Sequence, residues 1–262
     1  MASIDVTDLS ISFPLYHGDA RSLKQYAKQG LTDRFGHDER GRAAVEALRT
    51  VSFSLRPGDR LGLVGRNGAG KTTLLRALAG IYEPVKGRVQ VRGRLGTLLD
   101  TSLGMNPLLT GRENIRLRCL FHGLSAAAGK EVERDVEEFS DLGPFMDLPI
   151  NAWSSGMSVR LAFGLATAIM PQILIMDEWI MAGDGWFLRR AGERLGGMVD
   201  QSEIMVLSSH SPTILDRWCN RLIWMENGMI RMDGTVTDVL SAYLGVSWEK
   251  EKAAMEEKGS TD

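Results

Sequence analysis

The glycine-rich segment Gly65–Thr72 constrains the fold of this chain more than any other feature. Its sequence, GRNGAGKT, fits the pattern G-x-x-x-x-G-K-[ST] at every fixed position. Glycines let successive backbone N–H groups converge on a phosphate, and the following helix N-terminus adds its positive dipole end. Lys71 would contact the β- and γ-phosphates, and the Thr72 hydroxyl would bind Mg²⁺. The predicted phosphate-binding residues are Gly65, Asn67, Gly68, Ala69, Gly70, Lys71, Thr72 and Thr73.

A second apolar segment, Ile173–Met176, predicts a buried strand that ends in two carboxylates, Asp177 and Glu178. Asp177 would lie at the phosphate end of the sheet, where it orients Mg²⁺ and its waters. Glu178 stands beside it and could take a proton from the attacking water, a contribution typically worth about 10²–10⁴-fold in rate. Together with the glycine-rich segment, these carboxylates predict a site that hydrolyses a nucleotide.

Strands alternate with helices along much of the chain, which predicts an α/β fold with a largely parallel sheet. Helical periodicity from Thr110 to Ala168 interrupts this alternation and indicates an inserted helical subdomain. Asn227-Gly228 lies between two apolar runs and predicts a hairpin. The expected organisation is a core of residues 1–100 and 170–245, a helical subdomain over about 105–169, and a charged C-terminal tail over 246–262.

Charge and hydropathy exclude several classes of protein. The chain has 262 residues, with 31 Lys and Arg against 33 Asp and Glu, and this balance argues against a dedicated nucleic-acid binder. The longest stretch without charges, Leu161–Met176, contains Pro171 and is too short to span a bilayer. A short helix is expected over Ser22–Lys28, within a polar insertion over residues 17–41 whose basic residues are Arg21, Lys24, Lys28, Arg34 and Arg40. The insertion has two interpretations, a solvated loop or a surface that faces lipid headgroups or a membrane subunit.

The order of the motifs resembles that of the ATP-binding subunits of ABC transporters. The family's signature is a Ser-Gly pair at a helix N-terminus, and Ser155 and Gly156 match it between the two nucleotide motifs. The usual Gln after the Gly is Met157 here, and the usual Leu ahead of the serines is absent. The helix N-terminus would hold the γ-phosphate of a nucleotide bound to a second chain.

The same resemblance assigns further residues. His210, after the predicted strand Ile204–Leu207, would contact the γ-phosphate and help to position the attacking water. Asp184 belongs to a segment similar to the family's D-loop. Tyr16 is the candidate for stacking on adenine, with Phe13, or no stacking residue at all, as the alternatives. Asp100 ends a strand where the family normally has a glutamine, and could act near Mg²⁺ in its place.

Within the family, the chain looks like the subgroup that exports lipid-linked polysaccharides. This likeness rests on Trp153–Met157, on the segment Thr110–Ile115 and on the long basic insertion after Tyr16. Some members carry an extra C-terminal carbohydrate-binding domain. The residues that follow Gly245 are too few for one, so the resemblance implies the short form.

The resemblance implies a P-loop NTPase core of the RecA-like type, with a β subdomain and an inserted α-helical subdomain. It implies an ATPase that uses ATP and Mg²⁺, forms a homodimer through ATP, and acts at the cytoplasmic face of the cytoplasmic membrane. The partner would be a transmembrane permease in two copies, and neither glycan nor nucleic acid would be bound directly. O antigen is the expected cargo, and capsular polysaccharide, teichoic acid or a small imported solute are alternatives. A soluble ABC ATPase that acts on ribosomes or DNA is a further competitor.

Overall fold

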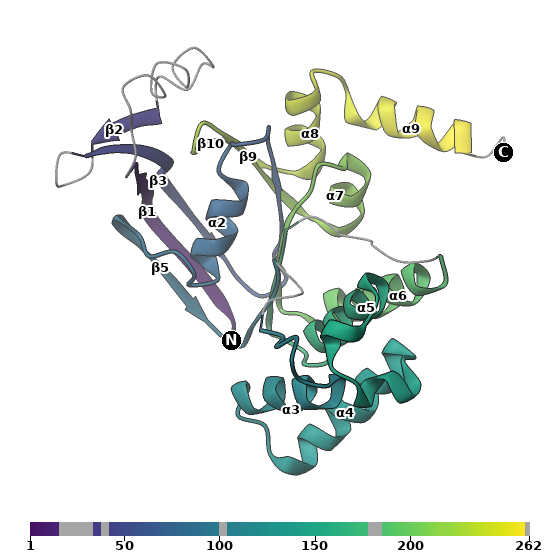
Figure 1. The fold of residues 1–262 in the computed structure, drawn as a ribbon. Coiled ribbons are helices and arrows are strands. Elements are labelled where there is room, and N and C mark those ends of the chain that lie inside the picture. Colours follow the sequence, from purple (N-terminus) through teal and green to yellow (C-terminus); the bar gives the residue numbers. More distant parts are fainter. Residues whose placement is uncertain (16–33, 38–41, 100–103, 178–184, 260–262) are drawn as a thin grey trace. The chain divides into compact units, whose positions relative to one another are not determined.

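The computed structural model describes residues 1–15, 34–37, 42–99, 104–177 and 185–259 (Figure 1). These residues form two compact units. The first unit comprises the described residues of Met1–Gly93, Ile175–Glu178 and Glu203–Asp262, and the second comprises those of Arg94–Leu174 and Trp179–Ser202. In the described part of the chain, no helix has the length and apolar character needed to cross a membrane.

One sheet of the first unit is antiparallel, with the strand order β2-β3-β1-β5. Buried side chains of β1 alternate at Ile4 and Val6, and then again at Leu9 and Ile11. The phase changes at Asp8, whose φ of 50° lies in the left-handed region and accompanies a shift in register. The strands are β1 (Ser3–Pro14), β2 (Phe35–His37), β3 (Ala43–Leu55) and β5 (Lys86–Arg92).

The other sheet of this unit has the order β10-β9-β4-β8-β7. Its central strand β4 pairs in parallel with both β8 and β9, so the predicted largely parallel sheet is confirmed. The predicted hairpin joins β9 to β10, and Asn227 and Gly228 both have positive φ, as a type I′ turn requires. The strands are β4 (Arg60–Val64), β7 (Ile173–Asp177), β8 (Ile204–Ser208), β9 (Arg221–Glu226) and β10 (Met229–Gly234).

The described residues of the first unit form four helices. Helix α2 lies between the two sheets, in contact with β3 and β5 on one side and with β8 on the other (Figure 1). Trp248 is buried at the start of the last helix, where its indole Nε1 donates a hydrogen bond to Asp216 (3.0 Å). The helices are α2 (Lys71–Leu78), α7 (Pro212–Trp218), α8 (Val236–Leu244) and α9 (Trp248–Gly259).

The second unit is mainly helical, and the α/β class that the sequence predicted is confirmed. Its core packs Ile115 against Val136, Met146 and Leu161. Ser125 caps the helix that follows it, as the sequence indicates, because its hydroxyl accepts a hydrogen bond from the Ala128 N–H. The elements are β6 (Leu95–Leu98), α3 (Gly111–Phe121), α4 (Ala126–Ser140), η2 (Gly143–Asp147), η3 (Ile150–Ala152), α5 (Ser155–Thr167) and α6 (Gly185–Gln201).

Candidate functional site

The glycine-rich segment connects β4 to α2 in the first unit. Gly65 has φ 151° and Gly70 has φ 106°, a range that L side chains rarely adopt. A Cβ on Gly65 would stand 2.4 Å from the carbonyl oxygen of Met225, and one on Gly70 would stand 2.9 Å from that of Ala47. Both positions therefore require glycine, for their backbone angles and for the close approach of neighbouring backbone.

The Lys71 side chain folds back and binds to the backbone of this loop. Its side chain is buried, and Nζ donates hydrogen bonds to the carbonyl oxygens of Gly65 (2.7 Å) and Arg66 (3.3 Å). The N-cap residue Gly70 supplies no side-chain cap, and the first turn of α2 has no acidic residue. The N-terminus of α2 is thus open to an anion. Thr72 is exposed on this first turn.

The remaining predicted phosphate-binding residues line the same loop. Asn67 and Gly68 are exposed, Ala69 is buried, and Thr73 is half-buried. The Ala69 carbonyl accepts a hydrogen bond from the Gly228 N–H (3.0 Å), so the β9–β10 turn supports the loop from outside. The structure therefore brings all eight predicted phosphate-binding residues onto one loop and the helix turn that follows it.

Arg34 also contacts this loop, a contact that sequence reasoning missed. One guanidinium nitrogen donates to the carbonyl of Gly68, and the other donates to the carbonyl of Ala47 (3.1 Å). Arg34 is only 7% exposed. The interpretation of the basic insertion as a solvated or membrane-facing surface is therefore wrong for Arg34. The sequence signal was hidden, because bonds to backbone carbonyls leave no pattern in the residues that accept them.

Strand β8 ends beside the loop, and β7 is the next strand of the same sheet. Ser208 ends β8 and lies opposite Leu63 of β4, just before the glycine-rich segment. His210 follows as an exposed residue, and half-buried Asp177 ends β7, the strand next to β8. Within the described part of the chain, the buried Oγ of Ser208 has no hydrogen-bond partner. A polar ligand or a water bound at this edge of the sheet would supply the hydrogen bond that this hydroxyl lacks.

Ser155 and Gly156 lie in the second unit, at the N-terminus of α5. The Ser154 hydroxyl caps the helix by accepting a hydrogen bond from the Met157 N–H (3.3 Å). Ser155 and Gly156 are both exposed, and no acidic residue occupies the first turn. Ser154 and Gly156 line a hollow of about 480 Å³, with Arg160 on its wall. This N-terminus can receive an anion from outside the chain.

Four predicted site residues, Tyr16, Asp100, Glu178 and Asp184, lie outside the described residues, so their roles stay predictions. The alternative to Tyr16 is Phe13, the second-to-last residue of β1, which is 37% exposed. Its ring meets that of Tyr82 edge-on, with centroids 5.1 Å apart.

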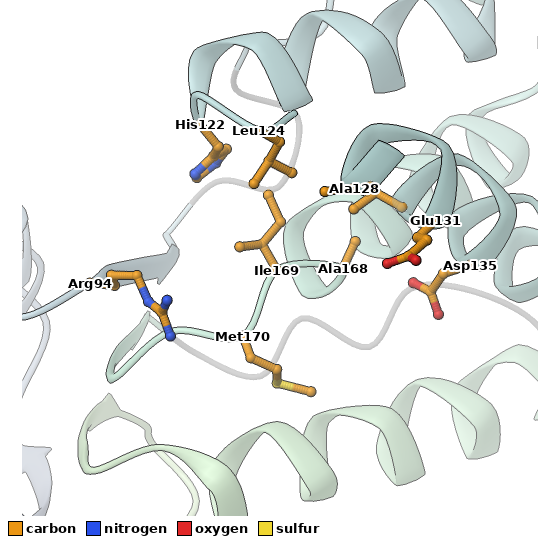
Figure 2. A pocket seen from close by; sticks show the side chains of 10 residues that line it. Arg94, His122, Leu124, Ala128, Glu131, Asp135, Ala168, Ile169 and Met170 are labelled. Atoms are coloured by element: carbon orange, nitrogen blue, oxygen red, sulfur yellow. The ribbon is translucent and has the colours of Figure 1, made fainter. Parts of the chain in front are cut away.

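A separate hollow of about 480 Å³ lies in the second unit, and none of the predicted site residues lines it (Figure 2). Arg94 and His122 stand on one side and Glu131 and Asp135 on the other, with Ile169 on its apolar wall. Burial, and then the nearby Arg118, lower the pKa of His122. Asp135 forms an ion pair with Arg194 of α6, so its charge is already compensated.

Comparison with known proteins gives the site a family context. The family model described as ABC transporter matches residues 48–181. The chain is 38% identical over 231 residues to the O-antigen export system ATP-binding protein RfbE of Yersinia enterocolitica, covering 88% of this chain and 97% of that protein. It is 34% identical to the O-antigen export system ATP-binding protein RfbB of Klebsiella pneumoniae, covering 92% and 96%.

A third relative is longer than this chain. The teichoic acids export ATP-binding protein TagH of Lactococcus lactis is 36% identical over 245 residues, which cover 93% of this chain and 52% of that protein. Among solved structures, the ATP-binding subunit of an ABC transporter matches with a TM-score of 0.69 and 22% identity, covering 94% of both chains. A post-hydrolysis dimer of an ATP-binding cassette with ADP and Pi matches at 0.65 and 18%, covering 89% and 98%. These two structures support the fold.

Proposed function

The chain belongs to the ABC transporter family of ATP-binding proteins, and on that premise we propose that it is the ATP-hydrolysing subunit of a polysaccharide exporter. The observation that carries this proposal is the match to an O-antigen export ATP-binding protein over 97% of that protein's length. O antigen is the leading cargo. Teichoic acid is the second candidate, because the likeness to a teichoic acid export protein is of similar strength.

The described residues fit a nucleotide with Mg²⁺. The N-terminus of α2 is uncapped, and Lys71 lies inside the loop that precedes it. Thr72 and Asp177 are the residues that would hold Mg²⁺, which would neutralise charge on the phosphates. Lys71 would bind the phosphates as a point charge, and Glu178 would accept a proton from the attacking water. His210 would position that water.

We place the second half of each site on another copy of this chain. Ser155 and Gly156 are exposed at an open helix N-terminus, and they would bind the γ-phosphate held by the other copy's loop. ATP would then favour a closed dimer and ADP would not, and only such a difference in affinity can shift a conformational equilibrium. Two copies of a membrane permease would receive this movement at the cytoplasmic face of the membrane.

Deletion of the gene, followed by gel analysis of envelope polysaccharides, tests the export proposal. We expect loss of surface polymer with accumulation inside the cell. Wild-type protein should restore export, and the Lys71→Ala variant should not. An unchanged polysaccharide profile would show that the cargo assignment is wrong while leaving the ATPase assignment intact.

A further inference from the structure

Arg34 is a buried cation beside the phosphate-binding loop. It is 7% exposed, and its two terminal nitrogens bridge the carbonyl oxygens of Gly68 in the loop and Ala47 in β3. The pairing of β2 with β3, which sets Phe35 opposite Val45, brings Arg34 to this position. The guanidinium thus ties the loop to the sheet next to it.

The bond to Gly68 has a consequence inside the loop. In a trans peptide the C=O and the N–H point in opposite directions, so Arg34 turns the N–H of Ala69 away from itself. That N–H donates to the carbonyl of Arg66 (3.0 Å), which closes the turn of the loop. The same Arg66 carbonyl accepts a hydrogen bond from Lys71 Nζ (3.3 Å). A continuous set of hydrogen bonds therefore connects Arg34 to the loop lysine.

The positive charge of Arg34 is also unusual, because a buried charge normally lies next to an opposite charge. Within the described residues its guanidinium faces carbonyl oxygens and no carboxylate, and its Nε has no hydrogen-bond partner. Burial, and then the nearby Arg49, lower the pKa of Arg34. A buried charge is costly unless it is paired, and an anion in the adjacent loop would compensate this one.

We propose that Arg34 is a positioning residue for ATP, which holds the phosphate-binding loop in its binding shape and adds positive charge beneath it. The basic insertion thereby contributes to the nucleotide site through its C-terminal end. This inference rests on the proposed role of the loop in binding phosphate. Arg34 acts through the loop backbone, so its loss should weaken the binding of ATP in the ground state and in the transition state alike. KM should therefore change more than kcat.

The test compares variants of the purified full chain by MgATP titration, steady-state ATPase kinetics and thermal unfolding without nucleotide. We expect Arg34→Gln to raise the Kd for MgATP by about tenfold, the order for a lost hydrogen bond to a charged group. Arg34→Lys keeps the charge but cannot bridge two carbonyls in the same way. Its Kd for MgATP should therefore lie between that of wild type and that of Arg34→Gln. In both variants kcat should stay within about threefold of wild type because binding is lost uniformly.

Two controls separate the possible failures. Arg56 extends from the far end of β3 and pairs with Asp5, so Arg56→Gln removes a charge from the same sheet and should leave the Kd unchanged. Lys71→Ala should weaken MgATP binding strongly. If Lys71→Ala loses binding and Arg34→Gln binds as wild type, the Arg34 proposal is wrong. If both bind as wild type, the role given to the loop is wrong as well.

A purely structural role for Arg34 predicts a different result. Arg34→Gln would then lower the unfolding temperature without nucleotide, while KM and Kd stayed as in wild type, and that outcome would overturn the proposal. If Arg34→Gln does not fold, Arg34→Lys carries the test, and a Kd equal to that of wild type would overturn the proposal.

Discussion

Helices α2 and α5 both begin at segments predicted to bind phosphate, yet their N-termini are built differently. At α2, buried Gly70 leaves the first turn uncapped, and neighbouring backbone and Arg34 support the loop ahead of it. At α5, Ser155 and Gly156 are exposed, and the Ser154 hydroxyl occupies one backbone N–H. The loop before α2 is shaped by contacts within one chain, whereas the α5 N-terminus is an exposed surface, which we propose is completed by a second copy of the chain.

Helix α3 shows the form of a helix N-terminus that needs no ligand. The Thr110 hydroxyl accepts a hydrogen bond from the Glu113 N–H (3.2 Å), and the Glu113 carboxylate accepts one from the Thr110 N–H (2.8 Å). This capping box satisfies the N-terminus and places a negative charge at its positive dipole end. Neither α2 nor α5 has an acidic residue in its first turn, so the positive dipole end of each helix is available to bind an anion from outside the helix.

The largest expected effect comes from Glu178→Gln, which removes the proposed general base but leaves both helix N-termini intact. Steady-state ATPase activity should fall by about 10²–10⁴-fold, the usual contribution of general-base catalysis. ATP affinity should persist, and a dimer should accumulate with ATP in size-exclusion chromatography. Glu226→Gln is the control, because Glu226 pairs with Arg231 in the β9–β10 hairpin. Turnover at the wild-type rate in Glu178→Gln would refute the base assignment.

A smaller effect on turnover should follow from Gly156→Asp, which places a negative charge at the α5 N-terminus. A Cβ at Gly156 comes no closer than 4.0 Å to Ser154 Oγ, so the fold should tolerate the change. We expect ATPase activity to fall by about 10²-fold, comparable to losing one preorganised donor. ATP binding by a single chain should be unchanged, since the loop before α2 is untouched. Gly192→Asp on α6, where an added Cβ meets nothing within 4 Å, is the matched control.

Mixing variants tests the comparison between α2 and α5 directly. A dimer of one Lys71→Ala chain and one Gly156→Asp chain would contain one site with an intact loop and an intact α5 N-terminus. We expect the mixture to recover activity that neither variant has alone. Failure of the mixture to recover activity, with both variants folded, would mean that the two motifs do not meet across a dimer.

Sequence periodicity was sufficient for elements with regular patterns and failed where the backbone departs from them. The strand before the glycine-rich loop, helix α2 and the Asn227-Gly228 hairpin follow from local patterns alone. Only the last part of β3, Val51–Leu55, shows the alternation that the sequence predicts as a strand, although β3 begins at Ala43. Thr50 explains the difference, because its φ of 48° interrupts the pleat and shifts the buried face.

One part of the candidate site, the glycine-rich loop, could be predicted from the sequence, and another part, Arg34, could not. The glycine-rich loop was predictable because its glycines are needed for local backbone angles. Arg34 was not, because its partners are carbonyl oxygens of Gly68 and Ala47, which any residue carries, and its burial depends on the pairing of β2 with β3. Contacts between distant backbone segments leave no periodic signal in the sequence.

Thr110→Ala should affect stability and leave the nucleotide chemistry unchanged. Loss of an N-cap hydroxyl typically costs about 0.5–2 kcal/mol in the free energy of unfolding. We expect chemical denaturation to show a change of this size and ATP affinity to remain at the wild-type value. A loss of ATPase activity as large as that of Gly156→Asp would remove α3 as the reference for a helix N-terminus without a ligand.

The smallest expected effect is a pH dependence at the same capping box. The hydrogen bond from the Thr110 N–H, and then that from the Thr110 hydroxyl, lower the pKa of Glu113. A lowered pKa in the folded state gives stability that is present above the unfolded pKa, about 4.3, and is lost as the pH falls through the folded value.

Glu113→Gln keeps a capping side chain without the charge. Wild type should therefore be slightly more stable than Glu113→Gln near neutral pH, and denaturation curves should converge in acid. A difference in unfolding free energy that stays constant across this range would mean that the carboxylate charge contributes nothing at α3, and the contrast with the open α2 and α5 termini would then rest on hydrogen bonding alone.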